Sequence, residues 1–362
     1  MKVLYLTDPQ LDYLADQLFT GLWKVLGREN VIDYPYKPAY HDPSCKAWYL
    51  PQYTTCPCDK ATILGLLREK AFDLAVMSAP RRNVIDAVQC LMANATLPPL
   101  VLVDGEDDDR LRLDTLEEFG CGLYFKREFR DTSLQGHRGW RNSWQGSPED
   151  HKIQGRVFPL PFAAILDTIP HLDVMVKDLD VSFFGRASST KRIEAVNILK
   201  KASGIRFEGG YYFEPSDRKS KVLGGTIARL FTKIRGDSYL SESERGKRLA
   251  PGDYYSLLAR SKMALSMRGG GFDTPRYWEI VACKALLISE KPDIDIPNNF
   301  EDKKHALFCR ADLADLVDLV RTYASDDAAR ERVVEDAYAH LLKYHTCERR
   351  AEYFLDTCRR IL

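Results

Sequence analysis

Short apolar runs alternate with amphipathic segments along the first third of the chain. The apolar runs have the length of buried strands, and they occupy residues 3–6, 31–34, 74–77, 100–103 and 123–125. Between them, apolar positions recur at helical spacing near residues 10–26, 59–70, 82–93 and 109–119. Alternation of this kind is typical of βαβ units, so we predict a parallel sheet with helices on its faces.

The alternation resumes after a proline-containing run at residues 155–162. Strand-like runs at 181–184 and 205–208 are separated by a helical pattern at 190–202, and a further helix is expected at 253–259. We therefore predict an α/β protein with two Rossmann-like domains in tandem. Open parallel sheets bind ligands at the carboxyl ends of their strands, so we expect the two domains to face a cleft.

The domain limits follow from these patterns. We assign residues 1–170 to an N-terminal domain, residues 171–345 to a C-terminal domain, and residues 346–362 to a charged C-terminal helix.

A strand, a glycine-rich turn, a helix and a second strand are predicted within residues 261–289. Three consecutive glycines at 269–271 can take positive φ and allow a ligand close to the backbone. Asp273 or Thr274 suits the N-cap position, and Pro275 is favoured as the first helical residue. A helix N-terminus at the end of a strand is a ready site for a phosphate group.

Charged side chains flank this predicted helix start. Arg268 and Arg276 are placed to donate bidentate hydrogen bonds to a phosphate. Glu279 lies further along the same helix, about 7–8 Å along its axis, within reach of a ribose hydroxyl. The spacing suits a nucleoside diphosphate, although arginine and glutamate in a first turn also serve as ordinary solvated capping charges.

The C-terminal third also resembles a known family. The matching residues are Tyr255-Ser256-Leu257-Leu258, Ser261-Lys262, Arg268-Gly269-Gly270-Gly271-Phe272-Asp273-Thr274, Arg276-Tyr277-Trp278-Glu279, Ala282-Cys283, Tyr344-His345-Thr346 and Arg349-Arg350-Ala351. This stretch, residues 254–356, resembles the C-terminal half of bacterial glycosyltransferases of the GT-B fold. Within them it is most similar to the spore-protein-like (CgeB-like) branch of the group-one families.

The resemblance implies roles for several residues. Glu279 is expected to bind the ribose of a sugar nucleotide and the helix N-terminus its diphosphate, while residues 346–362 are expected to pack back on the first domain. Retaining members often carry a second glutamate, whose position here is Gly271. Asp273 is a substitute for it, and the stereochemistry of transfer stays open. The expected donor-binding residues are Arg186, Arg268, Gly270, Gly271, Asp273, Thr274, Arg276 and Glu279.

Arg186 belongs to a second loop, which follows the first predicted strand of the C-terminal domain. We expect Arg186 to meet the diphosphate from the side opposite the glycines, with Ser189 or Thr190 capping the next helix. The same residues also fit a surface charge and an ordinary cap.

Sugar transfer with inversion needs a general base for the acceptor hydroxyl. Asp8 and Asp104 each follow a predicted strand of the first domain, so both are candidates. We rank them above the acidic run at 106–109, which suits a solvated helix start. Arg127 is a candidate for acceptor binding, and a surface salt bridge is equally compatible with its position.

Two further stretches carry alternatives. Residues 129–154 are rich in polar and aromatic side chains, including Trp140 and Trp144, and fit either an acceptor loop or rings packed on the core. Residues 218–233 resemble a basic amphipathic helix, which is typical of contact with an anionic membrane surface. Their adjacent glycines favour a basic loop over the donor site equally well.

Composition narrows the function classes. Lys plus Arg equals Asp plus Glu at 52 each, so no global positive field points to nucleic acid. No signal peptide or membrane-length apolar run is evident, so we expect a cytoplasmic protein, with membrane contact limited to residues 218–233. Nine cysteines suit reduced thiols, and the group of His41, Cys45, Cys56 and Cys58 lacks paired metal-binding knuckles, so we predict no metal.

Taken together, these features predict a metal-independent glycosyltransferase with no bound cofactor. Its co-substrate is a nucleoside diphosphate sugar, and its acceptor is a hydroxyl on a glycan or glycoconjugate of the cell surface. The alternative is a non-catalytic nucleotide- or sugar-binding module with a degenerate fold. A dehydrogenase is disfavoured because Thr7-Asp8-Pro9-Gln10 contains no dinucleotide-binding glycines.

Overall fold

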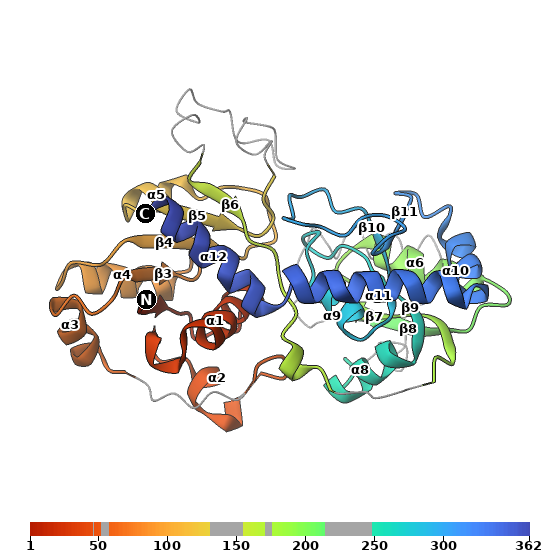
Figure 1. The fold of residues 1–362 in the computed structure, drawn as a ribbon, viewed down its shortest axis with the longest axis horizontal. Coiled ribbons are helices and arrows are strands. Elements are labelled where there is room, and N and C mark those ends of the chain that lie inside the picture. Colours follow the sequence, from red (N-terminus) through yellow and green to blue (C-terminus); the bar gives the residue numbers. More distant parts are fainter. Residues whose placement is uncertain (46, 52–57, 131–154, 171–175, 214–247) are drawn as a thin grey trace, which may run out of the picture. The chain divides into compact units, whose positions relative to one another are not determined.

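A computed structural model describes residues 1–45, 47–51, 58–130, 155–170, 176–213 and 248–362 (Figure 1). The chain divides into two compact units. The first comprises Met1–Thr168, Asp293–Asn299 and Leu341–Leu362, and the second comprises Ile169–Pro292 and Phe300–His340. Each unit contains one parallel sheet, so the predicted α/β class with two sheets is confirmed.

The first unit is built on a six-stranded sheet in the order β2-β1-β3-β4-β5-β6. Every neighbouring pair is parallel. The strands are β1 (Val3–Leu6), β2 (Val31–Tyr34), β3 (Leu74–Met77), β4 (Leu100–Asp104), β5 (Leu123–Lys126) and β6 (Val157–Pro159). The α-helices are α1 (Tyr13–Leu26), α2 (Pro38–His41), α3 (Lys60–Arg68), α4 (Arg82–Met92), α5 (Leu113–Glu118) and α12 (Cys347–Ile361).

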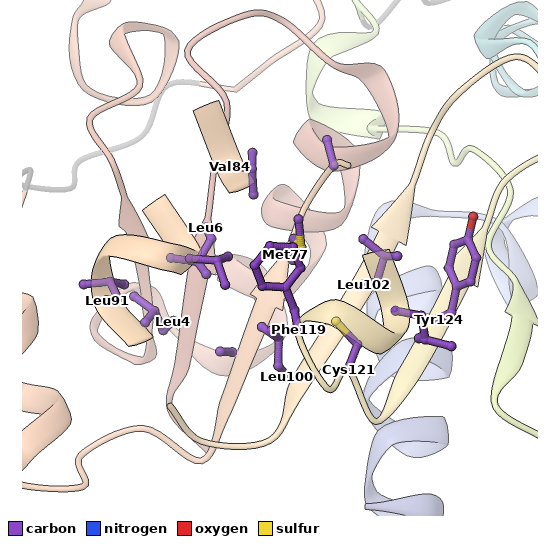
Figure 2. Close-up of a cluster of buried hydrophobic side chains, with 14 of the residues drawn as sticks. Leu4, Leu6, Met77, Val84, Leu91, Leu100, Leu102, Phe119, Cys121 and Tyr124 are labelled. Atoms are coloured by element: carbon purple, nitrogen blue, oxygen red, sulfur yellow. The ribbon is translucent and has the colours of Figure 1, made fainter. Parts of the chain in front are cut away.

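One face of this sheet carries an apolar core (Figure 2). Leu4 and Leu6 of β1 pack with Met77 of β3, and helices α3, α4 and α5 cover them with residues such as Val84 and Leu91. Alternate strand residues share a face, which explains why Leu4 and Leu6 enter the same cluster. Each fully buried side chain of this kind contributes about 1.5–3 kcal/mol.

The C-terminal helix α12 belongs to the first unit, as the family resemblance predicts. Its Phe354 packs against Phe125 of β5, with ring centroids 4.7 Å apart. Lys24 of α1 forms ion pairs with Glu348 at 2.7 Å and with Asp167 at 2.6 Å. Helix α12 therefore closes the face of the sheet opposite the core of Figure 2.

The second unit is built on a five-stranded sheet in the order β11-β10-β9-β7-β8. All its neighbouring pairs are parallel. The strands are β7 (Leu179–Arg186), β8 (Phe207–Tyr212), β9 (Ser261–Ser266), β10 (Leu286–Glu290) and β11 (Leu307–Cys309). Within the described residues, its α-helices are α6 (Thr190–Lys201), α8 (Pro251–Arg260), α9 (Pro275–Ala282), α10 (Leu316–Ser325) and most of α11 (Asp327–Tyr344), whose last residues belong to the first unit.

One strand lies later in the sequence than its pattern predicts. The run at 205–208 predicts a strand, whereas β8 begins at Phe207 and continues through Gly209 and Gly210. Glycine is a weak strand former, but a Cβ on Gly209 would collide with the carbonyl oxygen of Phe183 in β7. The close packing of β7 and β8 therefore requires glycine at position 209, although glycine has a low propensity for β-strands.

Helices α1 and α12 lie in close contact at Gly21. A Cβ at this position would collide with the Cys347 carbonyl oxygen and lie 2.9 Å from the Ala351 Cβ. We expect Gly21→Ala to destabilise the protein by more than the about 1–3 kcal/mol typical of an over-packed core, because a backbone group must move. Chemical denaturation of the variant measures this loss.

Gly65 in α3 provides the matched control, because a Cβ added there would meet nothing within 4 Å. Gly65→Ala should stabilise the protein by about 0.5–1 kcal/mol through helix propensity. Equal effects of the two substitutions would contradict the close approach of α1 and α12.

Candidate functional site

The order of strands in the second sheet creates a switch point between β7 and β9. The chain passes from β7 to β8 on one side and then returns to β9 on the other side. In open parallel sheets, ligands bind beyond the carboxyl ends of the strands at such a point. Arg186 is the last residue of β7, and the three glycines lie in the loop that follows β9.

Arg192 of α6 links the ends of β7 and β9. Its side chain is buried and donates from Nε to the Met267 carbonyl at 3.0 Å and from Nη1 to the Arg186 carbonyl at 2.9 Å. A Cβ on Gly269 would lie 2.9 Å from Nη2 of this guanidinium. Gly269 has no positive φ, so its role differs from the predicted one: it makes room for Arg192 rather than for a left-handed turn.

Arg268 is fixed through its backbone rather than its side chain. Its N–H donates to Glu290 Oε1 at 2.9 Å, and the other oxygen of Glu290 binds Lys191 at 2.8 Å. Its carbonyl accepts a hydrogen bond from Ser189 Oγ at 2.9 Å. The Arg268 guanidinium lies over the ring of Phe272, 5.3 Å from its centroid. Ser189 is also the N-cap residue of α6, but its hydroxyl does not cap that helix.

Helix α9 begins as the sequence predicts, with Thr274 as N-cap and Pro275 at the first helical position. The side chain of this N-cap residue makes no capping hydrogen bond to the helix. Thr274 Oγ1 lies 3.0 Å from Ser266 Oγ, and Asp273 Oδ1 accepts a hydrogen bond from Trp278 Nε1 at 3.0 Å. The Thr274 hydroxyl therefore does not occupy the N–H groups of the first turn of α9, and free N–H groups at a helix start favour binding of an anion.

Arg276 reaches across the switch point from α9 to β7. Its Nη2 donates to the Phe184 carbonyl at 2.9 Å, and the guanidinium lies 5.0 Å from the Phe183 ring centroid. A Cβ on Gly185 would lie 2.5 Å from Nη2, so the absence of a side chain at 185 permits this contact. Arg276 Nε is buried and has no hydrogen-bond partner among the residues that the structure describes.

Glu279 lies on the same helix and is 9% exposed. Burial raises the pKa of Glu279, and a hydrogen bond from Tyr254 together with the charge of Arg276 opposes that rise. Tyr254 Oη donates to Glu279 Oε2 at 2.8 Å. Helix α9 thus carries a cationic group near its start and a buried carboxyl further along, as the sequence predicts.

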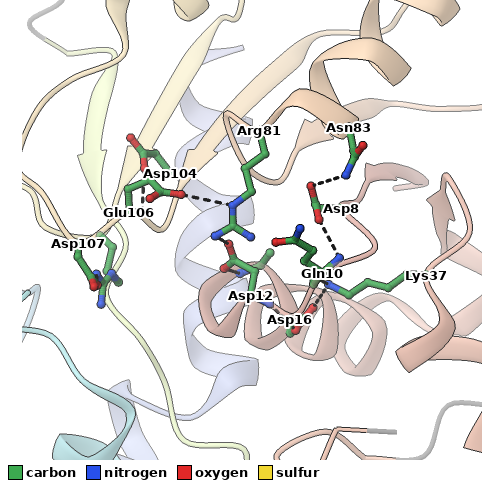
Figure 3. Close-up of polar contacts among 12 residues, drawn as sticks. Asp8, Gln10, Asp12, Asp16, Lys37, Arg81, Asn83, Asp104, Glu106 and Asp107 are labelled. Atoms are coloured by element: carbon green, nitrogen blue, oxygen red, sulfur yellow. Dashed lines mark hydrogen bonds and ion pairs between the residues drawn. The ribbon is translucent and has the colours of Figure 1, made fainter. Parts of the chain in front are cut away.

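The first sheet has its own switch point, between β1 and β3. Asp8 follows β1 there and is 3% exposed. It accepts hydrogen bonds from the Gln10 N–H at 2.7 Å and from Asn83 Nδ2 at 3.3 Å (Figure 3). Both donors are neutral groups, so the carboxylate is oriented without a direct ion pair in these contacts.

Asp104 ends β4, away from this switch point, and is fully buried. One oxygen accepts hydrogen bonds from Tyr124 Oη at 2.6 Å and from Lys126 Nζ at 3.1 Å. The other accepts the Glu106 N–H at 2.9 Å. Burial and the charge of Asp104 hold the pKa of Tyr124 well above its usual range, so the phenol remains a donor. This carboxylate is engaged on both oxygens.

Arg127 is buried beside β5. Its guanidinium pairs with Asp107 and lies 4.5 Å from the ring centroid of Phe162. The Arg127 N–H also donates to the Asp104 carbonyl at 3.0 Å. Arg127 therefore forms an ion pair, but its side chain is buried, whereas the alternative prediction was a salt bridge on the surface.

The sequence reasoning missed one ion-pair group at this edge of the sheet. Arg81, just before α4, binds Asp12 at 2.8 Å and Glu106 at 3.3 Å (Figure 3). Asp12 caps α1 by accepting the Ala15 N–H, and burial raises its pKa. The signal available was Asp12 itself, an acidic residue directly before a helical pattern that begins after the first strand.

Some predicted residues lie outside the described part of the chain. These are Trp140, Trp144, Cys56 and the basic stretch at 218–233. Among the described residues, no group of His, Cys, Asp or Glu is arranged to hold a metal ion, and His41 instead lies 2.8 Å from Asp33. No helix within the described ranges has the length and apolar character needed to cross a bilayer.

Comparison with known proteins bears on the fold. Residues 218–356 match a family model described as "Glycosyl transferase-like". The structure of Anabaena HepE in complex with UDP aligns with a TM-score of 0.59 and 12% identity over 99% of this chain and 100% of that chain. A glycosyltransferase from Rickettsia africae aligns with a TM-score of 0.62 and 9% identity over 99% and 98%.

Sucrose-phosphate synthase from Thermosynechococcus elongatus aligns with a TM-score of 0.55 and 12% identity, again over 99% of this chain and 98% of that chain. No curated protein matches the sequence. The chain has a GT-B fold. The predicted fold class is thereby confirmed, and the family match at 218–356 agrees with the predicted enzyme class, a glycosyltransferase.

The buried carboxyl of this GT-B chain predicts a pH-dependent stability. The folded-state pKa of Glu279 is raised above its ordinary value of 4.5, so its contribution to stability is present below that pH and is lost as the pH rises through the folded pKa. The glutamine in Glu279→Gln cannot titrate. We therefore expect the melting temperature of this variant to rise relative to that of the parent protein as the pH increases from about 4 to about 8.

Glu301 is the control with the opposite sign, because a hydrogen bond from Lys304 lowers its pKa. As the pH rises over the same range, the melting temperature of Glu301→Gln should fall relative to that of the parent protein or stay unchanged. Calorimetric scans of the three proteins test the pair. A parallel pH response of Glu279→Gln and the parent would show that Glu279 does not titrate abnormally.

Proposed function

We propose that this protein transfers a sugar from a nucleoside diphosphate sugar to a hydroxyl group on a glycan or glycoconjugate. The GT-B fold and the glycosyltransferase-like match of residues 218–356 support this class of reaction. Anabaena HepE, which shares the fold, binds UDP in its crystal structure. Within the class, the motifs at 254–356 support membership of the spore-protein-like (CgeB-like) branch.

The donor site is proposed at the switch point of the second sheet. The observation that carries it is the guanidinium of Arg276, whose buried Nε–H has no partner in the described residues. It lies in the first turn of a helix whose N-cap residue, Thr274, makes no side-chain capping hydrogen bond. Cationic and helix-terminal donors at one place stabilise the negative charge that develops on a leaving diphosphate. The proposed donor-binding residues are Arg186, Arg268, Gly270, Gly271, Asp273, Thr274, Arg276 and Glu279.

Glu279 is proposed to bind the ribose of the donor. It lies on the same helix as Arg276 and beyond it, so a nucleotide whose diphosphate meets the helix start extends its ribose toward this carboxyl.

Asp8 is the proposed general base, ahead of Asp104. A base must accept a proton from the acceptor hydroxyl, and a carboxylate whose charge is already neutralised by a buried cation is a weaker proton acceptor. Asp104 is bound by Lys126, whereas the hydrogen bonds to Asp8 come from neutral groups at a switch point. Arg127 remains the proposed acceptor contact. Membrane contact through residues 218–233 stays a prediction.

Removing the Arg276 contact tests the donor site. We expect Arg276→Ala to weaken nucleoside diphosphate binding by about 10–100-fold, because a charged hydrogen bond contributes about 1.5–3 kcal/mol and about 1.4 kcal/mol is tenfold. Gly185→Ala should weaken it by about tenfold, since the new methyl group displaces the guanidinium. Titration calorimetry with uridine, adenosine, guanosine, cytidine and thymidine diphosphates measures the affinities.

Gly210→Ala is the matched control, because its Cβ would lie 3.7 Å from the Phe184 ring, an ordinary contact. Its affinity should stay within about twofold of the parent value. Parent-like binding by both Arg276→Ala and Gly185→Ala would remove the donor assignment. If the parent protein bound none of the five diphosphates, the proposed function would be rejected.

Substitutions of Asp8 and Asp104 distinguish a catalytic role from a structural role. Asp8→Asn should lower the rate of sugar transfer by about 10²–10⁴-fold while nucleotide affinity and melting temperature stay near the parent values. Asp104→Asn should instead destabilise the fold by about 3–5 kcal/mol, because it leaves the Lys126 charge buried with one partner fewer. Transfer assays with labelled donor, run beside thermal denaturation, distinguish the two.

Full transfer activity in Asp8→Asn would exclude Asp8 as the base. Nucleotide binding without transfer or donor hydrolysis in the parent protein would favour the non-catalytic module instead.

A further inference from the structure

Glu279 is contacted by a tyrosine from a different helix. Tyr254 lies in the first turn of α8, and its hydroxyl donates to Glu279 Oε2 of α9 at 2.8 Å. The carboxyl is 9% exposed, so few water molecules reach it to replace this bond. Nothing in the pattern of residues 254–279 requires these two side chains to meet, since 25 positions separate them.

The direction of this hydrogen bond is fixed by its surroundings. Burial and the nearby charge of Glu279 hold the pKa of Tyr254 well above its usual value of 10, so the phenol keeps its proton and donates. An ionised carboxylate has about four acceptor positions on its two oxygens. Tyr254 takes one of them on Oε2 and thereby restricts the rotation of the carboxyl group.

Four neighbours favour the charged form of Glu279 against the effect of burial. They are hydrogen bonds from Tyr254 and Tyr255, and the positive charges of Arg276 and Arg248. Each additional hydrogen-bond donor stabilises a buried, ionised carboxylate further, because a buried acceptor without a hydrogen bond costs about 1–3 kcal/mol or more. Hydroxyl groups of a ligand are suitable donors.

We propose that Tyr254 is a positioning residue, which holds Glu279 in the orientation that accepts a hydrogen bond from the ribose 2′-hydroxyl of the donor nucleotide. This inference rests on the donor site proposed above. It names a ligand class, ribonucleotides in preference to 2′-deoxyribonucleotides. A site built to bond a hydroxyl rejects the analogue that lacks it, because its own buried polar group is then left unpaired.

The test compares affinities of matched nucleotides. UDP, ADP, GDP and CDP are each titrated beside their 2′-deoxy counterparts into the full-length parent protein, Tyr254→Phe and Tyr323→Phe. Tyr323 of α10 is the control, because it loses the same hydroxyl in the same unit, and the charged groups that act on it are Asp302, Asp326 and Arg332 rather than Glu279. We expect the parent and Tyr323→Phe to prefer the ribonucleotide by about tenfold or more.

In Tyr254→Phe the ribonucleotide should bind about five- to tenfold more weakly, with the deoxynucleotide changed by less than about twofold, so the preference nearly disappears. The pH dependence of ribonucleotide binding is a second measurement, and a purely structural role of Tyr254 would not change it. Loss of the Tyr254 donor should shift the midpoint of ribonucleotide binding to higher pH, since the charged carboxylate is less stabilised.

The outcomes separate the two levels of the proposal. An equal loss of affinity for both nucleotides of a pair, with an unmoved pH midpoint, would mean that Tyr254 only joins α8 to α9 and would overturn the inference. A parent protein that binds UDP but does not prefer it to 2′-deoxy-UDP would also overturn it, while the donor site stands. No binding of any diphosphate would overturn the proposed function and this inference together.

Discussion

The hydrogen bond from Arg276 to the Phe184 carbonyl exists because residue 185 has no side chain. It ties the start of α9 to the end of β7, which are the two sides of the switch point. The carbonyl satisfies a donor of the guanidinium without cancelling its charge. Arg192 makes the second tie, between the ends of β7 and β9. Together they preorganise the site, because the loops are fixed before any ligand arrives.

The two units treat buried charge differently at the carboxyl ends of their strands. In the first unit, Asp104 is matched by Lys126, and Asp12 is matched by Arg81. Removing either partner would leave a buried charge without its counter-ion, which is strongly destabilising. The intact pair adds little net stability, because both ions lose their hydration on burial. In the second unit, Glu290 is likewise matched by Lys191, whereas Arg276 is held by a carbonyl group and pairs with no carboxylate among the described residues.

The fold was largely accessible from the sequence, because apolar runs and helical periodicity report burial directly. The strands of the first sheet fall where the runs at 3–6, 31–34 and 74–77 predict them. Strand β11 was missed, since three residues at Leu307–Cys309 give too short a run to stand out. The helix start at Thr274 was also accessible, because cap residues and proline act locally.

The candidate site was accessible only in part. Arg276 and Glu279 share a helix, so their spacing can be read from the chain. The contacts of Tyr254, Gly185 and Arg192 cannot, because they join elements distant in sequence and depend on how strands are ordered in the sheet. The same holds for Asp8 and Asp104, which look equivalent as residues after strands until the sheet order separates them.

The close approach of α12 to Gly21 has a consequence for the order of assembly. The first unit needs residues 341–362, which leave the ribosome after the whole second unit has been made. Until then, the surface of α1 around Gly21 and the face of β5 that carries Phe125 lack their covering helix. Domains generally fold as they emerge during synthesis. The second unit, although it begins later in the chain, can therefore complete its core before the first unit does.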